Sequence, residues 1–402
     1  MTVNIKKSYA FGSVTAPPSK SISHRSLICA SLTNVSKIDN IGYSQDINAT
    51  VCCLETLGAK IKKDGDSLTV GGFNPFEIHD GTEIFCNESG STLRFLIPLC
   101  LLSGSRVALK GSKRLFERPL SVYEDICKEN GILFQKGTDS LTVCGKLKSG
   151  EYFVRGDISS QFISGLLFAL PLLDGDSKIN IIGSLESASY IDLTLKSLDD
   201  FGIKIKKENN SFVVFGNQKY KSKDVTVEGD CSNGAFLEAF NLFGGSVDVK
   251  GINENSIQGD RVYKSMFLKL KNGQKQFDLT DCPDLAPIMF AVSSLFGGAV
   301  FYGTKRLKIK ESDRISAMAC ELKKFGITVR ESDNTVEVKG GELIKPQEVL
   351  CGHNDHRIVM ALSVLCSVTS GSINGAEAVN KSYPDFFEKI SSLGIGIEYN
   401  ET

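Results

Sequence analysis

The sequence predicts a mixed α/β protein in which repeated helix-and-strand units form two domains. The chain has 402 residues, more than the roughly 100–200 of one ordinary domain. One phrase recurs six times: the end of a helix, a glycine, a strand, a polar turn and a second strand. Apolar segments between these phrases, such as "SSQFISGLLFALPLL", are hydrophobic nearly all round, which is typical of buried helices. Six units fit two domains of three.

Each phrase is centred on a glycine that we expect to end a helix in the left-handed conformation. The clearest copies are "LETLGAKIKKDGDSLTVGG" from Leu54, "CKENGILFQKGTDSLTVCG" from Cys127, "LDDFGIKIKKENNSFVVFG" from Leu198 and "LKKFGITVRESDNTVEVKGG" from Leu322. The copy "LKLKNGQKQFDLTD" is degenerate, and "ISSLGIGIEYNE" closes the chain. The expected anchors are Gly58, Gly131, Gly202, Gly273, Gly326 and Gly394. Their spacing of about 70 residues, with one interval of about 53, is typical of repeated supersecondary units.

Composition argues against several classes of protein. The net charge of −1 gives no overall signal for binding nucleic acid or a membrane surface. No apolar run reaches the roughly 18 residues of a membrane-spanning helix, and "MTVNIKKSYAFGSV" lacks the apolar segment of a signal peptide. The 12 cysteines form no C-x-x-C pair and, apart from adjacent Cys52 and Cys53, sit singly in apolar stretches. We therefore expect buried free thiols and a cytoplasmic location.

Polar and cationic residues cluster where six predicted helices begin. The first cluster, "PPSKSISHRSL", holds Lys20, Ser21, His24 and Arg25 ahead of an apolar run. Helix N-termini carry unpaired N–H groups and partial positive charge, so they attract anions. The other clusters contain Ser89, Gly90, Ser91, Thr92 and Arg94; Ser159, Ser160 and Gln161; Asp281 and Asp284; Lys310, Glu311 and Arg314; and Asn354, Asp355, His356 and Arg357.

The arginines are what N-capping alone does not explain. We expect Arg25, Arg94, Arg314 and Arg357 in first helical turns, where a cation opposes the helix dipole and costs a few tenths of a kcal/mol. Four such cases favour a shared anionic ligand over capping alone. Within the first cluster, Ser21 and Arg25 share one helix face, and Lys20 and His24 share another.

Several common sites are absent from the sequence. There is no G-x-x-x-x-G-K-[ST] loop, no G-x-G-x-x-G after a strand and no G-x-S-x-G elbow. His353 and His356 lack a convincing acid or thiol partner set for a metal. The remaining chemistry is general acid and base catalysis by Asp284, Glu311, His356 and lysines, so we predict neither a metal nor a cofactor.

Nine stretches together make the chain resemble the EPSP synthase family of enolpyruvyl transferases. They span residues 17 to 390 in the family's order: "PPSKSISHRSL", "SGSTLRFL", "ERPL", "GDISSQF", "SASYIDLTL", "DCPDLAPIM", "KIKESDRI", "HNDHRIVMAL" and "NKSYPDFFEKI". The resemblance implies a two-domain inside-out α/β barrel with three β-α-β-α-β-β repeats per domain. It implies one domain of residues 1–14 plus 228–402 and another of residues 15–227. The polar stretch at residues 219–236 is also the best boundary by composition.

The resemblance also implies a reaction and its residues. Phosphoenolpyruvate would give its enolpyruvyl group to the 5-hydroxyl of shikimate 3-phosphate and release phosphate through a tetrahedral intermediate. Asp284 would be the base for the hydroxyl, and Glu311 would protonate C3 of the enol. The implied shikimate 3-phosphate set is Lys20, Ser21, Arg25, Ser159, Ser160, Gln161, Ser187, Asp284 and Lys310. The implied phosphoenolpyruvate set is Lys20, Gly90, Arg118, Gln161, Arg314, Arg357 and Lys381, and Tyr190 and Arg94 match positions nearby.

Other interpretations stay open at this stage. Without the resemblance, Asp284 is an N-cap, Arg118 and Lys381 are surface residues, and Ser187 and Tyr190 merely start a helix. A UDP-N-acetylglucosamine enolpyruvyl transferase would need a Cys in the loop "KGSKRLFERP", which has none. A non-catalytic phospho-sugar-binding protein would not need both Asp284 and Glu311.

Three positions depart from the family pattern, namely Ser89, Ser91 and Arg306. The first two leave open the response to glyphosate, the family's phosphoenolpyruvate-competitive inhibitor, and we carry no phosphate contact over to Arg306. We expect a monomer whose partners are the two small-molecule substrates, with no nucleic acid or membrane.

Overall fold

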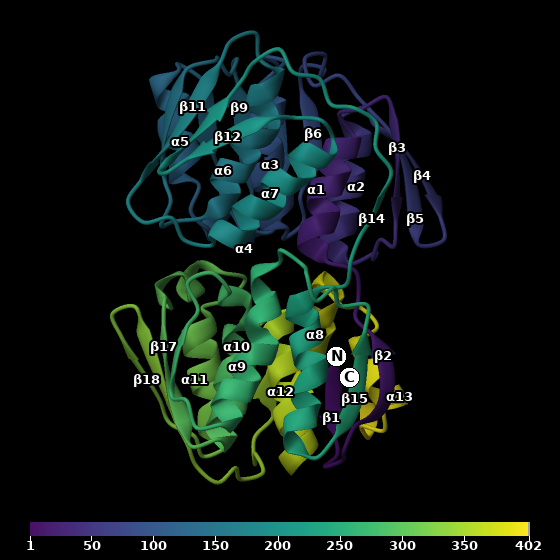
Figure 1. The fold of residues 1–402 in the computed structure, drawn as a ribbon, viewed down its shortest axis with the longest axis vertical. Helices are drawn as coiled ribbons and strands as arrows, with labels where there is room; N and C mark the ends of the chain where they lie inside the picture. The colour runs from purple at the N-terminus through teal and green to yellow at the C-terminus, as the bar shows by residue number, and fades with distance from the viewer. Residues whose placement is uncertain (401–402) are drawn as a thin grey trace. The chain divides into compact units, whose positions relative to one another are not determined.

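The computed structural model describes residues 1–400 and divides into two compact units. Unit 1 contains Met1–Pro17 and the chain from Gly229 onward, and unit 2 contains Pro18–Glu228 (Figure 1). Each unit has a hydrophobic core of its own. Within residues 1–400, no helix is long and apolar enough to cross a membrane.

Unit 2 has three four-stranded sheets with one shared plan. In each sheet two parallel strands lie side by side. The second of them also pairs, antiparallel, with one strand of a β-hairpin. The first sheet is β14 (Val225–Thr226), β3 (Val35–Asp39), β5 (Ser67–Gly71) and β4 (Lys60–Asp64). The second is β6 (Thr82–Phe85), β7 (Val107–Lys110), β9 (Ser140–Cys144) and β8 (Leu133–Lys136). The third is β10 (Glu151–Arg155), β11 (Ser177–Ile182), β13 (Ser211–Val214) and β12 (Ile205–Glu208).

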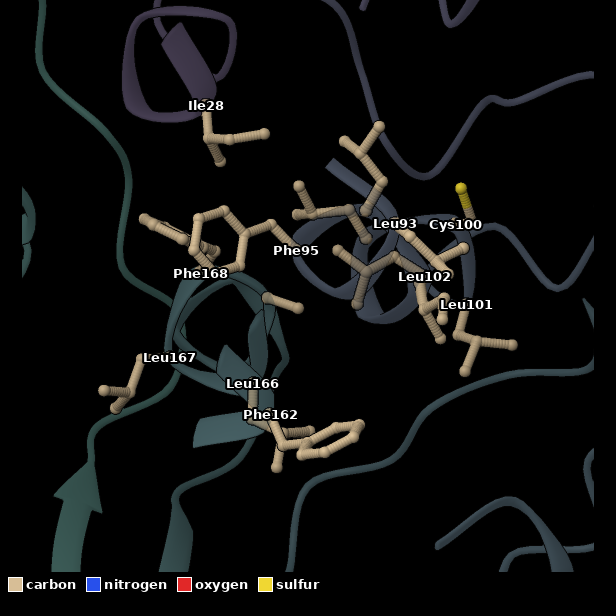
Figure 2. Close-up of a cluster of buried hydrophobic side chains, with 14 of the residues drawn as sticks. Ile28, Leu93, Phe95, Cys100, Leu101, Leu102, Phe162, Leu166, Leu167 and Phe168 are labelled. Atoms are coloured by element: carbon tan, nitrogen blue, oxygen red, sulfur yellow. The ribbon is translucent and has the colours of Figure 1, made fainter. Parts of the chain in front are cut away.

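Most helices of unit 2 pack side by side (Figure 1), and their buried apolar side chains belong to one core. Figure 2 shows Ile28, Phe95 and Phe168, from three different helices, pointing toward one another. The rings of Phe95 and Phe168 meet edge to face at 5.3 Å between centroids. The helices are α1 (Lys20–Ala30), α2 (Gln45–Thr56), α3 (Gly90–Cys100), α4 (Lys113–Glu117), α5 (Ser121–Glu129), α6 (Ser160–Ala169) and α7 (Ala188–Asp200), with a 3₁₀ turn η1 (Leu170–Leu172).

Within residues 1–400, unit 1 has two four-stranded sheets with the same strand directions as those of unit 2, and one sheet of two strands. The sheets are β16 (Gln276–Asp278), β17 (Gly298–Tyr302), β19 (Thr335–Lys339) and β18 (Val329–Ser332); β20 (Leu350–Cys351), β21 (Gly371–Asn374), β1 (Thr2–Ile5) and β22 (Ile397–Asn400); and β15 (Ser246–Lys250) with β2 (Phe11–Thr15). The α-helices are α8 (Cys231–Glu238), α9 (Tyr263–Lys271), α10 (Ala286–Leu295), α11 (Arg314–Lys324), α12 (His356–Thr369) and α13 (Phe386–Ser392). The 3₁₀ turns are η2 (Ala239–Phe243), η3 (Gly259–Val262), η4 (Pro283–Leu285), η5 (Lys305–Ile309) and η6 (Ala376–Lys381).

The six anchor glycines end helices as predicted, all with positive φ, from 67° at Gly131 to 112° at Gly58. Within residues 1–400, the prediction of a hairpin in every unit is wrong for two. After Gly394 the single strand β22 pairs with β1 from the other end of the chain, so no hairpin forms there. After Gly273 the chain runs directly into β16, the first strand of the next sheet, and the sheet of β2 and β15 has no hairpin. The missing hairpin accounts for the short interval between Gly273 and Gly326.

The cysteines are all free thiols, but the prediction that they are buried is wrong for three of them. Cys52, Cys320 and Cys351 are exposed and Cys144 is half-buried, whereas the other eight are buried. Cys52 and Cys320 lie on outward sides of α2 and α11, so an apolar sequence context did not place them inside.

Candidate active site

Two of the four arginines lie in the first turn of a helix, as the sequence predicted, but the prediction is wrong for the other two. Arg314 is the first residue of α11 and Arg357 the second of α12. Arg25 and Arg94 lie in the second turns of α1 and α3 because those helices already begin at Lys20 and Gly90. Only the two arginines of unit 1 therefore oppose a helix dipole from the first turn.

Arg25 joins two helices of unit 2 through three hydrogen bonds. Its Nε donates to Thr194 Oγ1 at 2.8 Å, its Nη1 to the Ser21 carbonyl at 2.7 Å and its Nη2 to the Tyr190 carbonyl at 2.8 Å. The guanidinium also lies 5.2 Å from the centre of the Phe95 ring. The predicted pairing of Ser21 with Arg25 exists, but it uses the backbone of Ser21.

Lys20, the first residue of α1, forms an ion pair with Asp46 of α2. Its Nζ lies 2.7 Å from Asp46 Oδ2, and both side chains are mostly buried. This partner was not predicted from the sequence, since Asp46 lies 26 residues away. The pair fixes the ammonium group near the starts of both helices.

Gln161 connects α6 with α3. Its Nε2 donates to Ser91 Oγ at 2.9 Å, and its Oε1 accepts from Arg94 Nη1 at 2.7 Å. Arg94 Nη2 donates at 3.0 Å to the carbonyl of Pro119, the residue after Arg118. The Gln161 amide therefore connects α6 with α3, and Arg94 connects both to the loop that carries Arg118.

Arg118 is not the surface residue that its sequence context suggested. It ends α4 in an extended conformation before Pro119, and only 8% of its surface is exposed. Its guanidinium covers Gly90: a Cβ added at Gly90 would lie 2.7 Å from Nη1. The start of α3 therefore has room for this cation only because residue 90 is glycine.

The remaining predicted residues of unit 2 also lie at helix starts. Ser159 caps α6 by accepting a hydrogen bond from the Gln161 amide at 3.3 Å, and Ser160 is buried beside it. Ser187 precedes α7 with φ 56° and ψ 45°, a left-handed conformation that is uncommon for serine. Such strain is often found at functional positions.

Asp284 is the centre of the polar cluster in unit 1. Its Oδ1 lies 2.9 Å from Arg314 Nη1 and 3.6 Å from Lys310 Nζ, and its Oδ2 lies 2.8 Å from Arg357 Nη2. It occupies the 3₁₀ turn η4, one residue before Leu285, which is the N-cap of α10. The N-cap interpretation of Asp284 is therefore wrong.

Arg314 is fully buried and bridges three carboxylates. Besides Asp284, it contacts Glu311 Oε2 at 2.8 Å and Asp355 Oδ2 at 2.9 Å. Three acids around one guanidinium explain why its side chain tolerates complete burial. The helix start itself is capped by Asp313, whose Oδ1 accepts from two amides at 3.1 Å.

Two further cations of unit 1 are held nearby. Arg357 Nη1 donates to Ser232 Oγ, and Lys381 Nζ donates to the Asn354 carbonyl at 2.6 Å. Lys381 is 6% exposed and ends the 3₁₀ turn η6, so it is not the surface lysine that its context alone suggested.

The cluster shifts the pKa values of its own members. Burial alone would raise the pKa of Asp284, but Arg357, Lys310 and Arg314 outweigh it and hold that pKa well below its ordinary value. Burial lowers the pKa of Lys310 to about 8; Asp284 opposes this, while Arg314 and Arg306 add to it. At neutral pH Asp284 is therefore ionised, and Lys310 loses its proton just above the physiological range.

His353 has an acid neighbour that reasoning from the sequence did not identify. Its Nε2 lies 2.9 Å from Oε1 of Glu321, which is buried on α11, and its backbone amide donates to Cys351 Sγ at 3.3 Å. Even so, no three His, Cys, Asp or Glu side chains within residues 1–400 are grouped so that they could hold a metal ion.

Comparison with known proteins decides the family. A sequence model described as EPSP synthase (3-phosphoshikimate 1-carboxyvinyltransferase) matches residues 6–390. The chain belongs to the EPSP synthase family. A relative from Clostridium kluyveri named 3-phosphoshikimate 1-carboxyvinyltransferase is 42% identical, covering 98% of this chain and 97% of its own. One of the same name from Clostridium botulinum is 41% identical, covering 95% of each chain.

The fold agrees with that of the EPSP synthase family. The structure of an EPSP synthase from Acinetobacter baumannii superposes with a TM-score of 0.79 at 21% identity, covering all of both chains. The predicted two-domain inside-out α/β barrel of the enolpyruvyl transferases is thereby confirmed.

Several residues that contact the predicted site residues were missed by reasoning from the sequence. Asp46, Thr194 and Ser232 contact Lys20, Arg25 and Arg357, yet they lie 26 to 169 residues away in the chain. Only Asp355 carried a signal, since it stands at a predicted helix start. It received no role, although it pairs with Arg314.

Proposed function

We propose that this member of the EPSP synthase family transfers the enolpyruvyl group of phosphoenolpyruvate to the 5-hydroxyl of shikimate 3-phosphate and releases phosphate. The reaction belongs to the shikimate pathway and serves aromatic amino acid biosynthesis. The observation that carries the proposal is identity of 41–42% over nearly the whole length of relatives named for this activity. Neither a UDP-N-acetylglucosamine transferase nor a non-catalytic binding protein is favoured by these relatives.

The acids and cations of unit 1 support a division of chemical work. We propose that Asp284 takes the proton of the 5-hydroxyl as its oxygen attacks C2 of the enol, and that Glu311 gives a proton to C3. Without substrates, Asp284 forms ion pairs with Arg314 and Arg357. An anionic substrate that draws these cations to itself would raise the pKa of Asp284 and make it a stronger base.

The substrate-binding sets are proposals carried over from the family. The proposed contacts of shikimate 3-phosphate are Lys20, Ser21, Arg25, Ser159, Ser160, Gln161, Ser187, Asp284 and Lys310. The proposed contacts of phosphoenolpyruvate are Lys20, Gly90, Arg118, Gln161, Arg314, Arg357 and Lys381. Their support is the burial of five cationic side chains, since buried cations need anionic partners: Arg25, Arg118, Arg314, Arg357 and Lys381.

A phosphate-release assay tests the function. We expect phosphate only when phosphoenolpyruvate and shikimate 3-phosphate are both present, without added metal. Phosphate release from phosphoenolpyruvate alone, or with UDP-N-acetylglucosamine in place of the shikimate compound, would refute the proposal.

Gly90→Ala should weaken phosphoenolpyruvate binding. The new methyl group would displace the Arg118 guanidinium, because its Cβ would lie 2.7 Å from Nη1 and 2.9 Å from Cζ. We expect KM for phosphoenolpyruvate to rise about 10- to 100-fold, which corresponds to roughly 1.4–2.7 kcal/mol. Steady-state kinetics provide the measurement. Gly42→Ala is the matched control, since its Cβ would meet Pro18 at an ordinary 3.5 Å, and an unchanged KM in Gly90→Ala would contradict the placement of Arg118.

Lys310 should make kcat/KM for shikimate 3-phosphate fall above pH 8. Its pKa of about 8 means that the cation is present below this pH and lost above it. Substrate phosphates, with second pKa values of about 6, are fully ionised over this pH range. We expect kcat/KM to decline by up to about tenfold per pH unit from pH 8 to 9.5. Lys310→Arg keeps its charge, so its profile should be flatter; parallel profiles would show that another group titrates.

Location and assembly are proposed separately. We propose that the enzyme works in the cytoplasm, because its twelve free cysteines suit a reducing compartment. We also propose that it acts as a monomer, and light scattering of the purified protein at assay concentration checks this prediction.

A further inference from the structure

The His24 ring begins a chain of buried side-chain hydrogen bonds that crosses three helices of unit 2. Its Nδ1 lies 2.8 Å from Thr50 Oγ1, which lies 2.6 Å from Thr92 Oγ1. Thr92 Oγ1 in turn donates to Ser89 Oγ at 2.7 Å. None of the four side chains is more than 1% exposed. We call His24, Thr50, Thr92 and Ser89 the hydroxyl relay.

The relay has one consistent direction. Thr92 uses its hydroxyl proton on Ser89, so it must accept from Thr50, and Thr50 must then accept from His24. The competing contact of the Thr50 hydroxyl, with the Asp46 carbonyl, is longer at 3.3 Å. The ring therefore carries its proton on Nδ1.

The other ring nitrogen supports this direction. His24 Nε2 is buried and has no hydrogen-bond partner within residues 1–400. In the reverse direction it would be a buried N–H without an acceptor, and orphaned N–H groups are rarer in proteins than unsatisfied acceptors. Burial, followed by the charges of Lys20 and Arg25, also holds the pKa of His24 well below its ordinary value, so the ring stays neutral.

We propose that His24 is a positioning residue that, through the hydroxyl relay, fixes the start of α3 against α1 and α2. This inference rests on the proposed function. Ser89 is the N-cap of α3, and its Oγ also accepts from the Thr92 amide at 3.2 Å. The residues that follow, Gly90 and Ser91, contact Arg118 and Gln161.

The relay acts on the proposed binding residues without touching a substrate. Lys20 and His24 share a face of α1. Asp46 of α2 forms an ion pair with Lys20, and Thr50 of α2 is hydrogen-bonded to His24. A shift of α3 relative to α1 would break a hydrogen bond between buried hydroxyls, and a buried polar group left without a partner is destabilising. The relay thus holds the Lys20 ammonium and the Gly90 backbone at a set separation.

The first test is the tautomer of His24 in the wild-type protein, read from its ring ¹⁵N chemical shifts at neutral pH without substrates. Because the chain has only 4 histidines, His24→Asn assigns the signals. We expect a neutral ring protonated at Nδ1. A ring protonated at Nε2, or on both nitrogens, would overturn the relay. This readout does not depend on activity, so it separates failure of the relay from failure of the proposed function.

The second test uses substitutions that keep or remove the hydrogen bond. An Asn side-chain amide can donate to Thr50 from near the position of Nδ1, whereas Leu cannot. We expect His24→Leu and Thr50→Val to raise KM for both substrates about tenfold, and His24→Asn to stay within about twofold of wild type. Thr56→Val, on the exposed end of α2, is the matched control. Equal effects of Asn and Leu, or an unchanged KM in both His24→Leu and Thr50→Val, would overturn the proposal.

Discussion

Glu311→Gln should lower kcat by about 10²–10⁴-fold, the usual contribution of a general acid or base, while both substrates still bind. The amide oxygen of Gln can accept the hydrogen bond that Glu311 Oε2 now accepts from Arg314 Nη2 at 2.8 Å, so the cluster stays connected. What the variant lacks is a proton that it can give to C3 of the enol. Single-turnover and steady-state kinetics with both substrates measure the effect.

Glu388→Gln is the matched control for this prediction. Glu388 lies exposed on α13 of the same unit, so its loss of charge should leave kcat within the error of the assay. If Glu311→Gln turned over at a near-normal rate, the proton donor would have to be another group, and Lys310 would be the next to replace. A rise in KM with unchanged kcat would instead assign Glu311 to binding.

Arg314→Met should lower the free energy of unfolding by about 3–5 kcal/mol at pH 7, the usual cost of removing one partner of a buried ion pair. Arg314 is fully buried, and its loss leaves Asp284, Glu311 and Asp355 without their shared cation. Met is similar in length, so the loss of charge rather than a cavity dominates. Denaturant unfolding of both proteins measures the difference.

The carboxylates decide whether the free energy of unfolding rises or falls with pH. In the wild type the pKa of Asp284 is held well below its ordinary value, so its stabilising contribution is present above about pH 4 and is lost as the pH falls through the lowered pKa. In Arg314→Met one cation fewer opposes the effect of burial, so the pKa of Asp284 should rise and the ionised acid should destabilise the protein at neutral pH relative to the wild type. The difference between the two proteins should therefore shrink from pH 7 toward pH 4.

Two variants control for other effects of Arg314→Met. Arg314→Lys keeps the charge but cannot reach three carboxylates at once, so we expect an intermediate loss. Arg261→Met, at an exposed site in η3, should change the free energy of unfolding by no more than about 0.5 kcal/mol. A loss of stability in Arg314→Met that stays constant from pH 7 to pH 4 would contradict the electrostatic explanation.

A structural feature was predictable from the sequence where its signal lies in a few neighbouring residues. The helix ends at Gly58, Gly131 and their counterparts were predictable because a left-handed residue after a helix needs glycine whatever surrounds it. Buried helices such as α6 and α10 were predictable because they are apolar all round. The missing hairpin after Gly273 was visible only as a degenerate repeat and a short interval.

The partners of the site residues were not predictable in this way. Arg25 meets Thr194 across 169 residues, and Arg357 meets Ser232 across 125. A single sequence carries no signal for such contacts, because they depend on which helices pack together and at what register. The exposed Cys320 shows the same limit, since the side of a helix that faces solvent is decided by its neighbours.

The sequence by itself determined the family, the repeating unit and the residue types that gather at helix starts. These follow from local rules: glycine where the backbone must be left-handed, apolar residues where a helix is enclosed, and polar groups where N–H donors are unpaired. Only the tertiary structure decided the state of those residues. It made Asp284 a bridge between arginines rather than a helix cap, buried Arg118 against Gly90, and gave His24 a partner in Thr50. The physical reason is that ionisation, burial and hydrogen-bond direction depend on what packs against a side chain, and packing joins residues that are distant in the chain.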